Sequence, residues 1–454
     1  MRIDFQWREN LPLALPVIVG QIGHIAASVA DSMMVGVLGT IPLAAVSLAS
    51  SIVSVPLVFG IGMAYGLTPL VAHAVGQMRP AKAVRWLKNA TLINAISSLF
   101  MGLFAWALFA FVQQTGQESE VIDEARTYLW VVIASYGPFM LFMAAKQFLE
   151  GQGDTKAPMR ISIFGNMGNI VLNGIFIYGW WIFPSWGIVG AGIATFIARI
   201  YMMTAAWWLV LRRGKADPLH WIQAKVSRNA LQSLLKIGLP SGFQYIFEVS
   251  AFAASAWIIG TFGAKPLAAH QVAISLASIS YMAATGLGAA ATIRIGQKMG
   301  QKDIPGARNA GTSLFGLTVL FMLLTGMVFF AFRNYLPFAY TDDETVAQAA
   351  ANLLIVATLF QVSDGVQATA LGALRGIQDV RIPTAITFVA YYLVALPLEW
   401  YLGHVLGFEQ VGVWTALALG LTISAIWLTY RFYAGMDRRA TKVIGLRTGE
   451  GSMG

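Results

Sequence analysis

The sequence predicts an all-α integral membrane protein with twelve membrane-spanning helices. Of its 454 residues, 57% are hydrophobic and only 11% are charged, whereas a soluble domain carries about 25% charged residues. Apolar stretches of about 20 residues, the length that crosses roughly 30 Å of hydrocarbon, recur along the chain. The two halves of the chain also repeat each other. Cysteine is absent, which excludes disulfides, thiol nucleophiles and cysteine-held metals.

The predicted spans are joined by short connections and are rich in small residues, which let helices pack closely in lipid. The first span is too long for the apolar core of a signal peptide and contains Asp31, so we expect it to be retained. The spans cover approximately residues 10–37, 43–75, 87–112, 127–150, 158–181, 187–212, 231–261, 266–293, 306–333, 345–374, 382–403 and 410–434.

Basic residues divide unequally between the two sets of connections. Most of the thirty Lys and Arg residues fall on the side of the termini, while the other side holds Arg126, Lys265 and Arg333 beside several acids. By the positive-inside rule, both termini are expected in the cytoplasm. The net charge of +9 therefore reflects topology, and we expect no nucleic-acid partner.

A shift of about 224 residues aligns the chain with itself at positions where Gly and Pro have backbone meaning. The aligned segments are 15–16 with 239–240, Gly36 with Gly260, Gly39 with Gly263, 42–45 with 266–269, and 76–77 with 300–301. Each half holds six spans, so both halves enter the membrane in the same direction. The repeat predicts two parallel, pseudo-symmetric six-helix lobes around a central cavity, the arrangement of alternating-access transporters.

The repeat also sets the expected domain limits. The N-terminal lobe, with spans 1–6, covers residues 1–212, and the C-terminal lobe, with spans 7–12, covers residues 237–435. A basic cytoplasmic linker is expected at 213–236 and a cytoplasmic tail at 436–454.

Three acidic residues lie inside predicted spans and away from the span ends, namely Asp31, Glu248 and Asp364; the other acids fall in loops, at the termini or near span ends. A carboxylate at the centre of a bilayer costs about 2.5–3.5 kcal/mol even on the lenient insertion scale, so we expect each to face the protein interior or a watery cavity. The alternative is a structural pair with Lys146 or Arg199. The shift places Ser255 opposite Asp31 and His24 opposite Glu248, so a symmetric scaffold carries asymmetric acids.

Such carboxylates suit ion coupling. Burial disfavours their charged form, so they can bind and release protons, and their oxygens could also hold Na⁺, notably at Glu248 and Asp364. An organic cation would compete for the same charge, so that ion and cargo lower each other's affinity.

Other polar residues in the spans are also candidates. Asn169 and Asn173 share one helix face and could reach Asp31, or they could join helices structurally. Thr195 and Gln271 are further polar candidates. Pro16 permits a kink in the first helix. No group of His, Asp and Glu has metal-ligand spacing, so no resident metal or cofactor is expected.

Several segments together resemble the multidrug and toxic compound extrusion (MATE) transporters, NorM-like branch, over essentially the whole chain. They are residues 29–36 around Asp31, 247–249 around Glu248, 364–367 beginning at Asp364, 374–376, and the Asn169–Asn173 pair ahead of 176–179. The resemblance implies a multi-pass antiporter of the cell inner membrane that exports small cationic amphipathic compounds in exchange for H⁺ or Na⁺.

The resemblance also assigns residues. It places Asp31, Asn169 and Asn173 at a cation site of the first lobe, and Glu248 with Asp364 at one of the second. Gln271 and Tyr281 would line the drug cavity with Thr195, and Asp343 would cap it. Asn173 stands where other branches carry Asp, which leaves this lobe with one carboxylate fewer. We expect a monomer whose partners are its substrates and membrane lipids.

Two alternatives compete with this function. A lipid-intermediate flippase of the same superfamily would favour a cavity rich in Arg and Lys, but only Lys146 and Arg199 lie in spans here. An intramembrane enzyme would need a Ser/His pair, paired catalytic aspartates or HExxH, and none is present. The chain is therefore not expected to be an enzyme.

Overall fold

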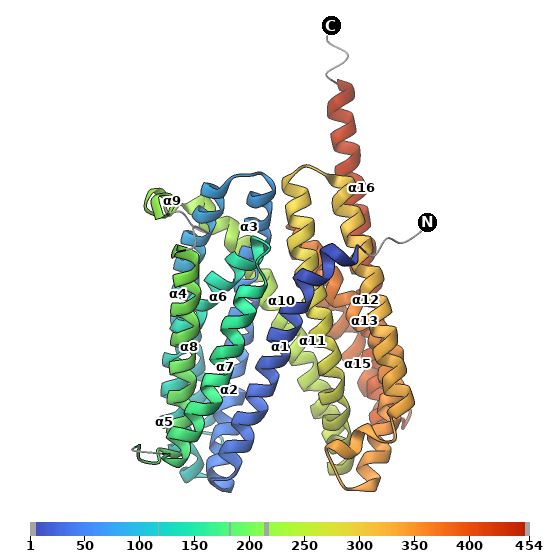
Figure 1. Cartoon of the computed structure of the whole chain (residues 1–454). Helices are drawn as coiled ribbons and strands as arrows, with labels where there is room; N and C mark the ends of the chain where they lie inside the picture. Colours follow the sequence, from blue (N-terminus) through green and yellow to red (C-terminus); the bar gives the residue numbers. More distant parts are fainter. Residues whose placement is uncertain (1–5, 117, 181–182, 213–217, 450–454) are drawn as a thin grey trace. The chain divides into compact units, whose positions relative to one another are not determined.

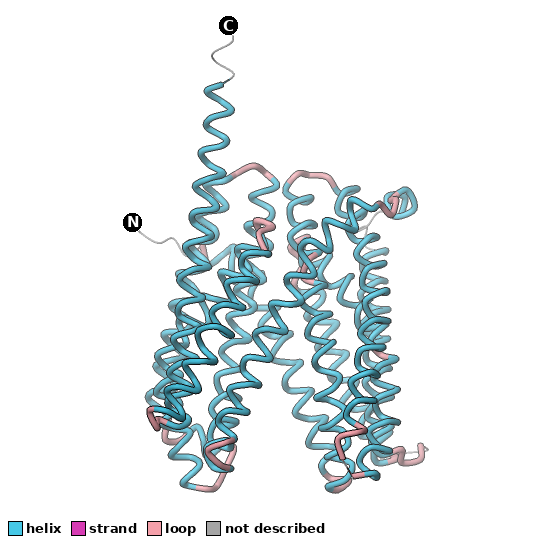
Figure 2. The backbone as a smooth tube through the Cα atoms, turned by 180° about the vertical axis from the view of Figure 1, so that it is seen from behind, coloured by secondary structure: helices cyan, strands magenta, loops and turns pink. Residues whose placement is uncertain are grey.

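The computed structural model describes residues 6–116, 118–180, 183–212 and 218–449, and within these ranges the chain forms helices and loops without strands (Figure 2). The helices of the first half, labelled in Figure 1, are α1 (Trp7–Gly36), α2 (Thr40–Ala64), α3 (Leu67–Gly76), α4 (Pro80–Val112), α5 (Ser119–Ala134), α6 (Tyr136–Gly151), α7 (Lys156–Tyr178), α8 (Gly187–Arg212) and α9 (Pro218–Gln223). The second half has α10 (Arg228–Gly260), α11 (Ala264–Gly300), α12 (Ile304–Phe332), η1 (Leu336–Ala339), α13 (Glu344–Gly376), α14 (Arg381–Phe388), η2 (Val389–Ala395), α15 (Leu396–Trp400), η3 (Tyr401–Val405) and α16 (Glu409–Gly449).

Twelve helical stretches of the described chain are long and apolar enough to cross a membrane, which confirms the predicted number. Three of them combine several helices: α2 with α3, α5 with α6, and α14 through η3. The break after α2 falls at Gly66, where a Cβ would lie 2.9 Å from the backbone of Gly238. Close approach of two backbones therefore requires glycine at this turn. Pro12 and Pro16 both lie within α1, which continues through them.

The chain forms two compact units. Unit 1 consists of residues 1–18 and 244–454, and unit 2 of residues 19–243. Each unit thus takes one end of α1 and one end of α10. The change from one unit to the other falls at equivalent places in the two halves, because the repeat shift carries residues 18–19 almost onto residues 243–244. The lobe and linker limits expected above remain predictions.

Part of the stretch expected as a linker packs on α4 of unit 2. Lys88 donates to the backbone oxygen of Trp221 at 3.0 Å, and Arg85 donates to the Ser227 hydroxyl at 2.8 Å. The buried Asn89 side chain accepts from the Ser227 backbone N–H at 3.0 Å. Residues 221–227 are therefore anchored rather than free.

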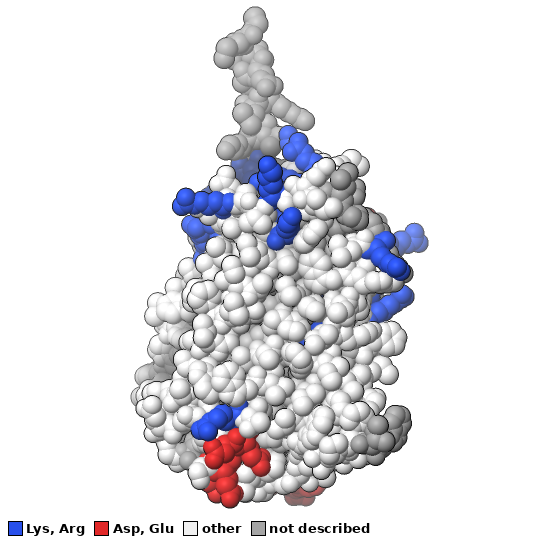
Figure 3. All heavy atoms as spheres, turned by 90° about the vertical axis from the view of Figure 1, so that its left-hand side faces the viewer, with Lys and Arg blue, Asp and Glu red and all other residues white. Residues whose placement is uncertain are grey.

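Charged side chains separate along the helices. On the face shown in Figure 3, most Lys and Arg lie toward one end, and a group of Asp and Glu lies at the other with a basic side chain beside it. In the sequence, four acids stand at the start of α5, whereas basic residues surround the start of α4. The distribution is the one from which the topology was predicted.

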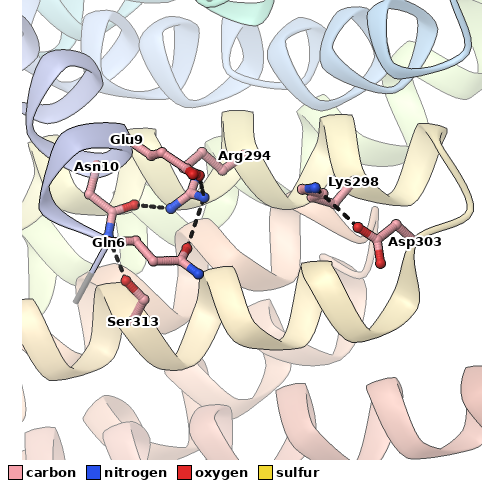
Figure 4. Close-up of polar contacts among 7 residues, drawn as sticks. All are labelled: Gln6, Glu9, Asn10, Arg294, Lys298, Asp303 and Ser313. Carbon is pink, nitrogen blue, oxygen red and sulfur yellow. Dashed lines mark hydrogen bonds and ion pairs between the residues drawn. The ribbon is translucent and has the colours of Figure 1, made fainter. Parts of the chain in front are cut away.

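A polar cluster ties the start of α1 to α11 and α12 within unit 1. Figure 4 shows Arg294 of α11 directed at Gln6, Glu9 and Asn10, to which it donates hydrogen bonds. The Asn10 side-chain amide in turn donates to the Ser313 hydroxyl at 2.7 Å. Arg294 is only 7% exposed, so its charge is matched by these oxygens instead of water.

Candidate functional site

The first cluster surrounds Asp31, near the end of α1 in unit 2. Its carboxylate accepts a hydrogen bond from the Asn173 amide of α7, with 2.5 Å between Oδ1 and Nδ2. Asn169 lies one turn earlier on the same face. The Asn169 amide is oriented so that both its nitrogen and its oxygen have hydrogen-bond partners. Its Nδ2 then lies 2.8 Å from Asp31 Oδ1, and its oxygen accepts from the Thr195 backbone N–H at 3.2 Å. The structure thus brings both asparagines to Asp31, as the helical spacing predicts, and adds Thr195 to the cluster.

Asp31 is held by neutral donors. Amide hydrogen bonds stabilise a carboxylate without cancelling its charge. Arg199 of α8 acts on Asp31 electrostatically, but its guanidinium donates to the Ser135 hydroxyl at 2.6 Å. Lys146, the other cation expected as a structural partner, lies 3.9 Å from Glu150. Among the described residues, no ion pair joins Asp31, Glu248 or Asp364 to Lys or Arg, so the structural-pair alternative has no support from the contacts.

The second cluster lies in unit 1 and contains both remaining carboxylates. Glu248 of α10 and Asp364 of α13 are each 5% exposed and act on each other electrostatically. The Tyr281 hydroxyl of α11 donates to Glu248 Oε1. Within the described chain, Asp364 Oδ1 is buried without a hydrogen-bond partner. Arg375 acts on Glu248 electrostatically without forming an ion pair with it among the residues described. Two neighbouring buried carboxylates repel when both are charged, so a bound proton or cation would stabilise the pair.

Tyr391 joins this second cluster from η2. Its hydroxyl accepts from the Gln367 amide of α13 at 2.8 Å, and it interacts with both Glu248 and Asp364. The sequence reasoning missed Tyr391 and Gln367, because tyrosine is common in membrane helices and only the fold shows which ones meet a carboxylate. It also assigned Tyr281 to drug binding, whereas its hydroxyl contacts Glu248.

The remaining predicted residues lie apart from these contacts. Gln271 is exposed on α11, about three turns before Tyr281. Asp343 is exposed and caps α13, accepting from the backbone N–H groups of Thr345 and Val346. Hydrogen bonds from the Thr345 hydroxyl and these N–H groups hold the pKa of Asp343 below its ordinary value. The structure therefore gives Asp343 a helix-capping contact, and its role over a drug cavity remains a prediction.

Two buried carboxylates escaped the sequence analysis, which placed both near span ends. Glu150 is 3% exposed and has Lys146 as its partner. Glu399 of α15 is fully buried, and in the described part of the chain neither of its carboxylate oxygens has a hydrogen-bond partner. The repeat offers a signal for Glu399, because Leu172-Asn173 aligns with Leu398-Glu399 once the shift is lengthened slightly.

Comparison with known families and proteins agrees with this architecture. The MatE family model matches residues 16–175 and 240–401, one match for each half of the repeat. The multidrug resistance protein NorM of Photobacterium profundum is 33% identical, over 93% of this chain and 94% of its own length. The multidrug resistance protein MdtK of Yersinia pseudotuberculosis is 30% identical, over 93% of this chain and 94% of its own.

Solved structures share the fold. A MATE protein in complex with MaL6 superimposes with a TM-score of 0.87 at 21% identity, covering 95% of this chain and 97% of that one. An outward-facing multidrug resistance MATE family transporter of the MOP superfamily has a TM-score of 0.87 at 20% identity, covering 95% and 96%. With twelve apolar helices, these likenesses describe a multi-pass membrane protein. The chain therefore belongs to the MatE family, the multidrug and toxic compound extrusion group that its residue patterns predict.

Proposed function

We propose that this protein is a multidrug efflux antiporter that exports small cationic amphipathic compounds in exchange for H⁺ or Na⁺ by alternating access. The family and the names of the relatives support efflux of several drugs. The proposed coupling residues are Asp31 with Asn169 and Asn173 in unit 2, and Glu248 with Asp364 in unit 1. The protein would work without a resident cofactor, as a transporter and not as an enzyme.

One observation carries the proposal: the three carboxylates within spans form no ion pair with Lys or Arg in the described chain. Asp31 has amide donors and Glu248 has a phenol donor, all of them neutral. A carboxylate already paired with a fixed cation would have no charge left to exchange. These groups keep their charge available for a proton, a sodium ion or an organic cation.

Competition for that charge would couple the two fluxes. A bound cation favours release of the proton or Na⁺, and reloading of the ion expels the cation, since each binding free energy is lowered by the other. Each elementary charge that moves down a potential of about 100 mV supplies roughly 2.3 kcal/mol. The proposed location is the inner membrane, with both termini in the cytoplasm, and the proposed working form is a monomer in contact with lipids.

Transport in reconstituted liposomes tests the proposal. The purified protein would be given a pH gradient or a Na⁺ gradient separately, and efflux of a fluorescent organic cation would be followed. We expect one of the gradients to drive efflux, and Asp31→Asn, Glu248→Gln and Asp364→Asn to reduce it. Efflux that needs neither gradient, or movement of an anionic lipid in its place, would contradict the antiporter and favour a channel or a flippase.

A further inference from the structure

Within the spans of the described chain, a fourth carboxylate lacks a Lys or Arg partner; it lies in unit 1, outside the Glu248–Asp364 pair. Glu399 belongs to α15, a single α-helical piece between the π-helical segments η2 and η3. It is 0% exposed, and neither carboxylate oxygen has a hydrogen-bond partner among the described residues. Such a group is costly to bury and calls for an explanation. Irregular π turns within α-helices are frequent at functional sites.

Ser255 of α10 is the polar neighbour of this carboxylate. Its hydroxyl, however, donates its hydrogen to the Ala251 carbonyl oxygen at 3.1 Å, so Glu399 does not receive it at hydrogen-bond geometry. Leu396, on the same helix α15, packs on an apolar core that includes Ala251 and Ile258.

The repeat gives this pair a counterpart. The repeat shift carries Asp31 to Ser255, and a slightly longer shift carries Asn173 to Glu399, where Ile170-Val171-Leu172 meets Leu396-Pro397-Leu398. In unit 2 the two positions form the contact between Asp31 and Asn173. In unit 1 the same two positions again face each other, with the acid on the other helix. Both units therefore place one carboxylate at this contact.

Charge around Glu399 is sparse. No Lys or Arg acts on it among the described residues, and α16, which packs on α15, has no charged residue between Glu409 and Arg431. His404 on η3 is the nearest basic side chain along the sequence, and its Nε2 lies in a hydrogen bond with the Thr261 hydroxyl at 2.9 Å. Titratable groups on the neighbouring elements include Tyr245 and Glu248 on α10, Lys265, His270 and Tyr281 on α11, Tyr391 and Tyr392 on η2, Tyr401 and His404 on η3, and Glu409, Tyr430 and Arg431 on α16.

We propose that Glu399, with Ser255, forms an additional proton-binding site of unit 1, at the position that repeats the Asp31–Asn173 contact. In the closed, dry site the carboxyl keeps its proton, because no cation compensates a negative charge there. When an organic cation binds within unit 1, its positive charge takes over that compensation, and the carboxyl releases its proton to water once the site opens. The inference rests on the proposed antiport and adds one exchanged proton to each transport cycle.

The local chemistry favours a proton over Na⁺. Hard metal cations collect several oxygen ligands. Apart from its own two oxygens, Glu399 has the Ser255 hydroxyl as its polar side-chain neighbour in the described chain, and that hydroxyl is already engaged with Ala251. A proton needs only one carboxylate oxygen.

Proton release on cation binding tests the site. Tetraphenylphosphonium is a suitable probe because it carries a fixed charge and no titratable group. Calorimetric titration of the purified protein in buffers of different ionisation enthalpy gives the number of protons released per bound cation. We expect Glu399→Gln to release fewer protons than the unmodified protein, and the slope of log Kd against pH to fall by up to about one. Glu120→Gln replaces an exposed acid in the first turn of α5 and serves as the control. It should change neither the number of protons released nor the slope of log Kd against pH.

A second pair of variants keeps the test decisive if Glu399→Gln does not fold. S255D/E399N recreates in unit 1 the arrangement of unit 2, whereas S255N/E399N removes the acid and differs from it at one side chain. We expect the first to release more protons per bound cation than the second. Equal release from these two variants, or unchanged release from a folded Glu399→Gln, would overturn the site.

The outcomes separate the two proposals. If the unmodified protein releases no protons on binding the probe, proton antiport itself fails. If it releases protons and they depend on Asp31, Glu248 or Asp364 but not on Glu399, only the additional site fails.

Discussion

The amide of Asn173 is the shortest polar contact of Asp31, and its contribution is measurable because α7 offers a matched control. A hydrogen bond to a charged group contributes about 1.5–3 kcal/mol. If transport depends on this contact, Asn173→Ala should lower the initial rate of cation efflux from liposomes about tenfold or more. Asn166 lies on the same helix and is also buried, but within the described chain its amide nitrogen has no partner. Asn166→Ala should therefore leave the rate nearly unchanged, and an equal loss in both variants would contradict the role of Asn173.

Tyr281 permits a similar test in unit 1. Tyr281→Phe keeps the ring and removes the hydroxyl that donates to Glu248. We expect weaker binding of tetraphenylphosphonium, measured calorimetrically, because the carboxylate loses a neutral donor that holds its geometry. Tyr335→Phe removes a hydroxyl from a tyrosine that is 74% exposed, and should bind the cation like the unmodified protein. Identical affinities in both variants would separate Tyr281 from the cation site.

Part of the arrangement at these residues follows from the sequence. The spacing of Asn169 and Asn173 predicts their common approach to Asp31, because a helical period of 3.6 residues follows from local geometry. The partners of Glu248 could not be predicted, since Tyr281 and Tyr391 lie on other helices and meet it only after packing. Apolar length alone does not predict the burial of Glu399, and only the repeat, which aligns it with Asn173, offers a signal for it.

Helices α11 and α13 approach each other closely at two glycines, Gly288 and Gly372. A Cβ on Gly372 would lie 2.1 Å from the Gly288 carbonyl oxygen, and one on Gly288 would lie 2.7 Å from that of Ala368. Gly372→Ala should therefore destabilise the protein, by about 1–3 kcal/mol as for other overpacked sites. Gly168 lies within α7 with no atom near its missing Cβ, so Gly168→Ala should be neutral or slightly stabilising. Measuring the free energy of unfolding of both variants in detergent checks the difference. Comparable stability would show that α11 and α13 can move apart enough to accommodate the added methyl group.

The start of α12 predicts a pH dependence. Asp303 caps this helix, with its Oδ1 accepting from the Gly306 N–H at 2.8 Å and its Oδ2 lying 3.0 Å from Lys298 Nζ. The Gly306 hydrogen bond and, second to it, Lys298 hold the pKa of Asp303 below its ordinary value. Its stabilising effect is thus complete above the unfolded-state pKa and disappears as pH falls through the lower folded-state pKa.

Asp303→Ala should lower the free energy of unfolding by about 1 kcal/mol at neutral pH, the usual effect of losing an N-cap. The ion pair adds little to this, because both side chains are at least a third exposed (36% and 39%). Asp303→Asn retains a capping oxygen and should be nearly as stable as the unmodified protein. The difference between the unmodified protein and Asp303→Ala should shrink in acid; a constant difference at all pH values would show that the carboxylate charge is not involved.

The element boundaries show where sequence reasoning stops. The twelve spans follow from hydrophobic length, and the structure has the same number. The divisions at Gly66 and Ser135 and the π turns of η2 and η3 do not follow from it, because they depend on which helix packs against each position.

For the whole molecule, the topology can be tested without background, since the chain contains no cysteine. Thr115→Cys introduces a thiol in the connection between α4 and α5, and Gln301→Cys introduces one in the connection between α11 and α12; both positions are exposed. From the positive-inside rule, a membrane-impermeant maleimide should label the first in intact cells and the second only after permeabilisation. The reverse pattern would place the termini outside the cytoplasm.

The π-helical segment η2 bears on how the two halves of the chain diverged. Pro158 aligns with Pro383, and farther along Asn173 aligns with Glu399, but the second alignment needs a shift longer by a single position. The segment η2 lies between Pro383 and Glu399, where that extra position must be accommodated. A π turn takes up one additional residue without ending the helix. A duplicated gene can thus tolerate an insertion inside a membrane helix, because the extra residue is absorbed as a local bulge. Deleting one residue from η2 would instead turn Glu399 by about 100° around the helix axis and away from its partner.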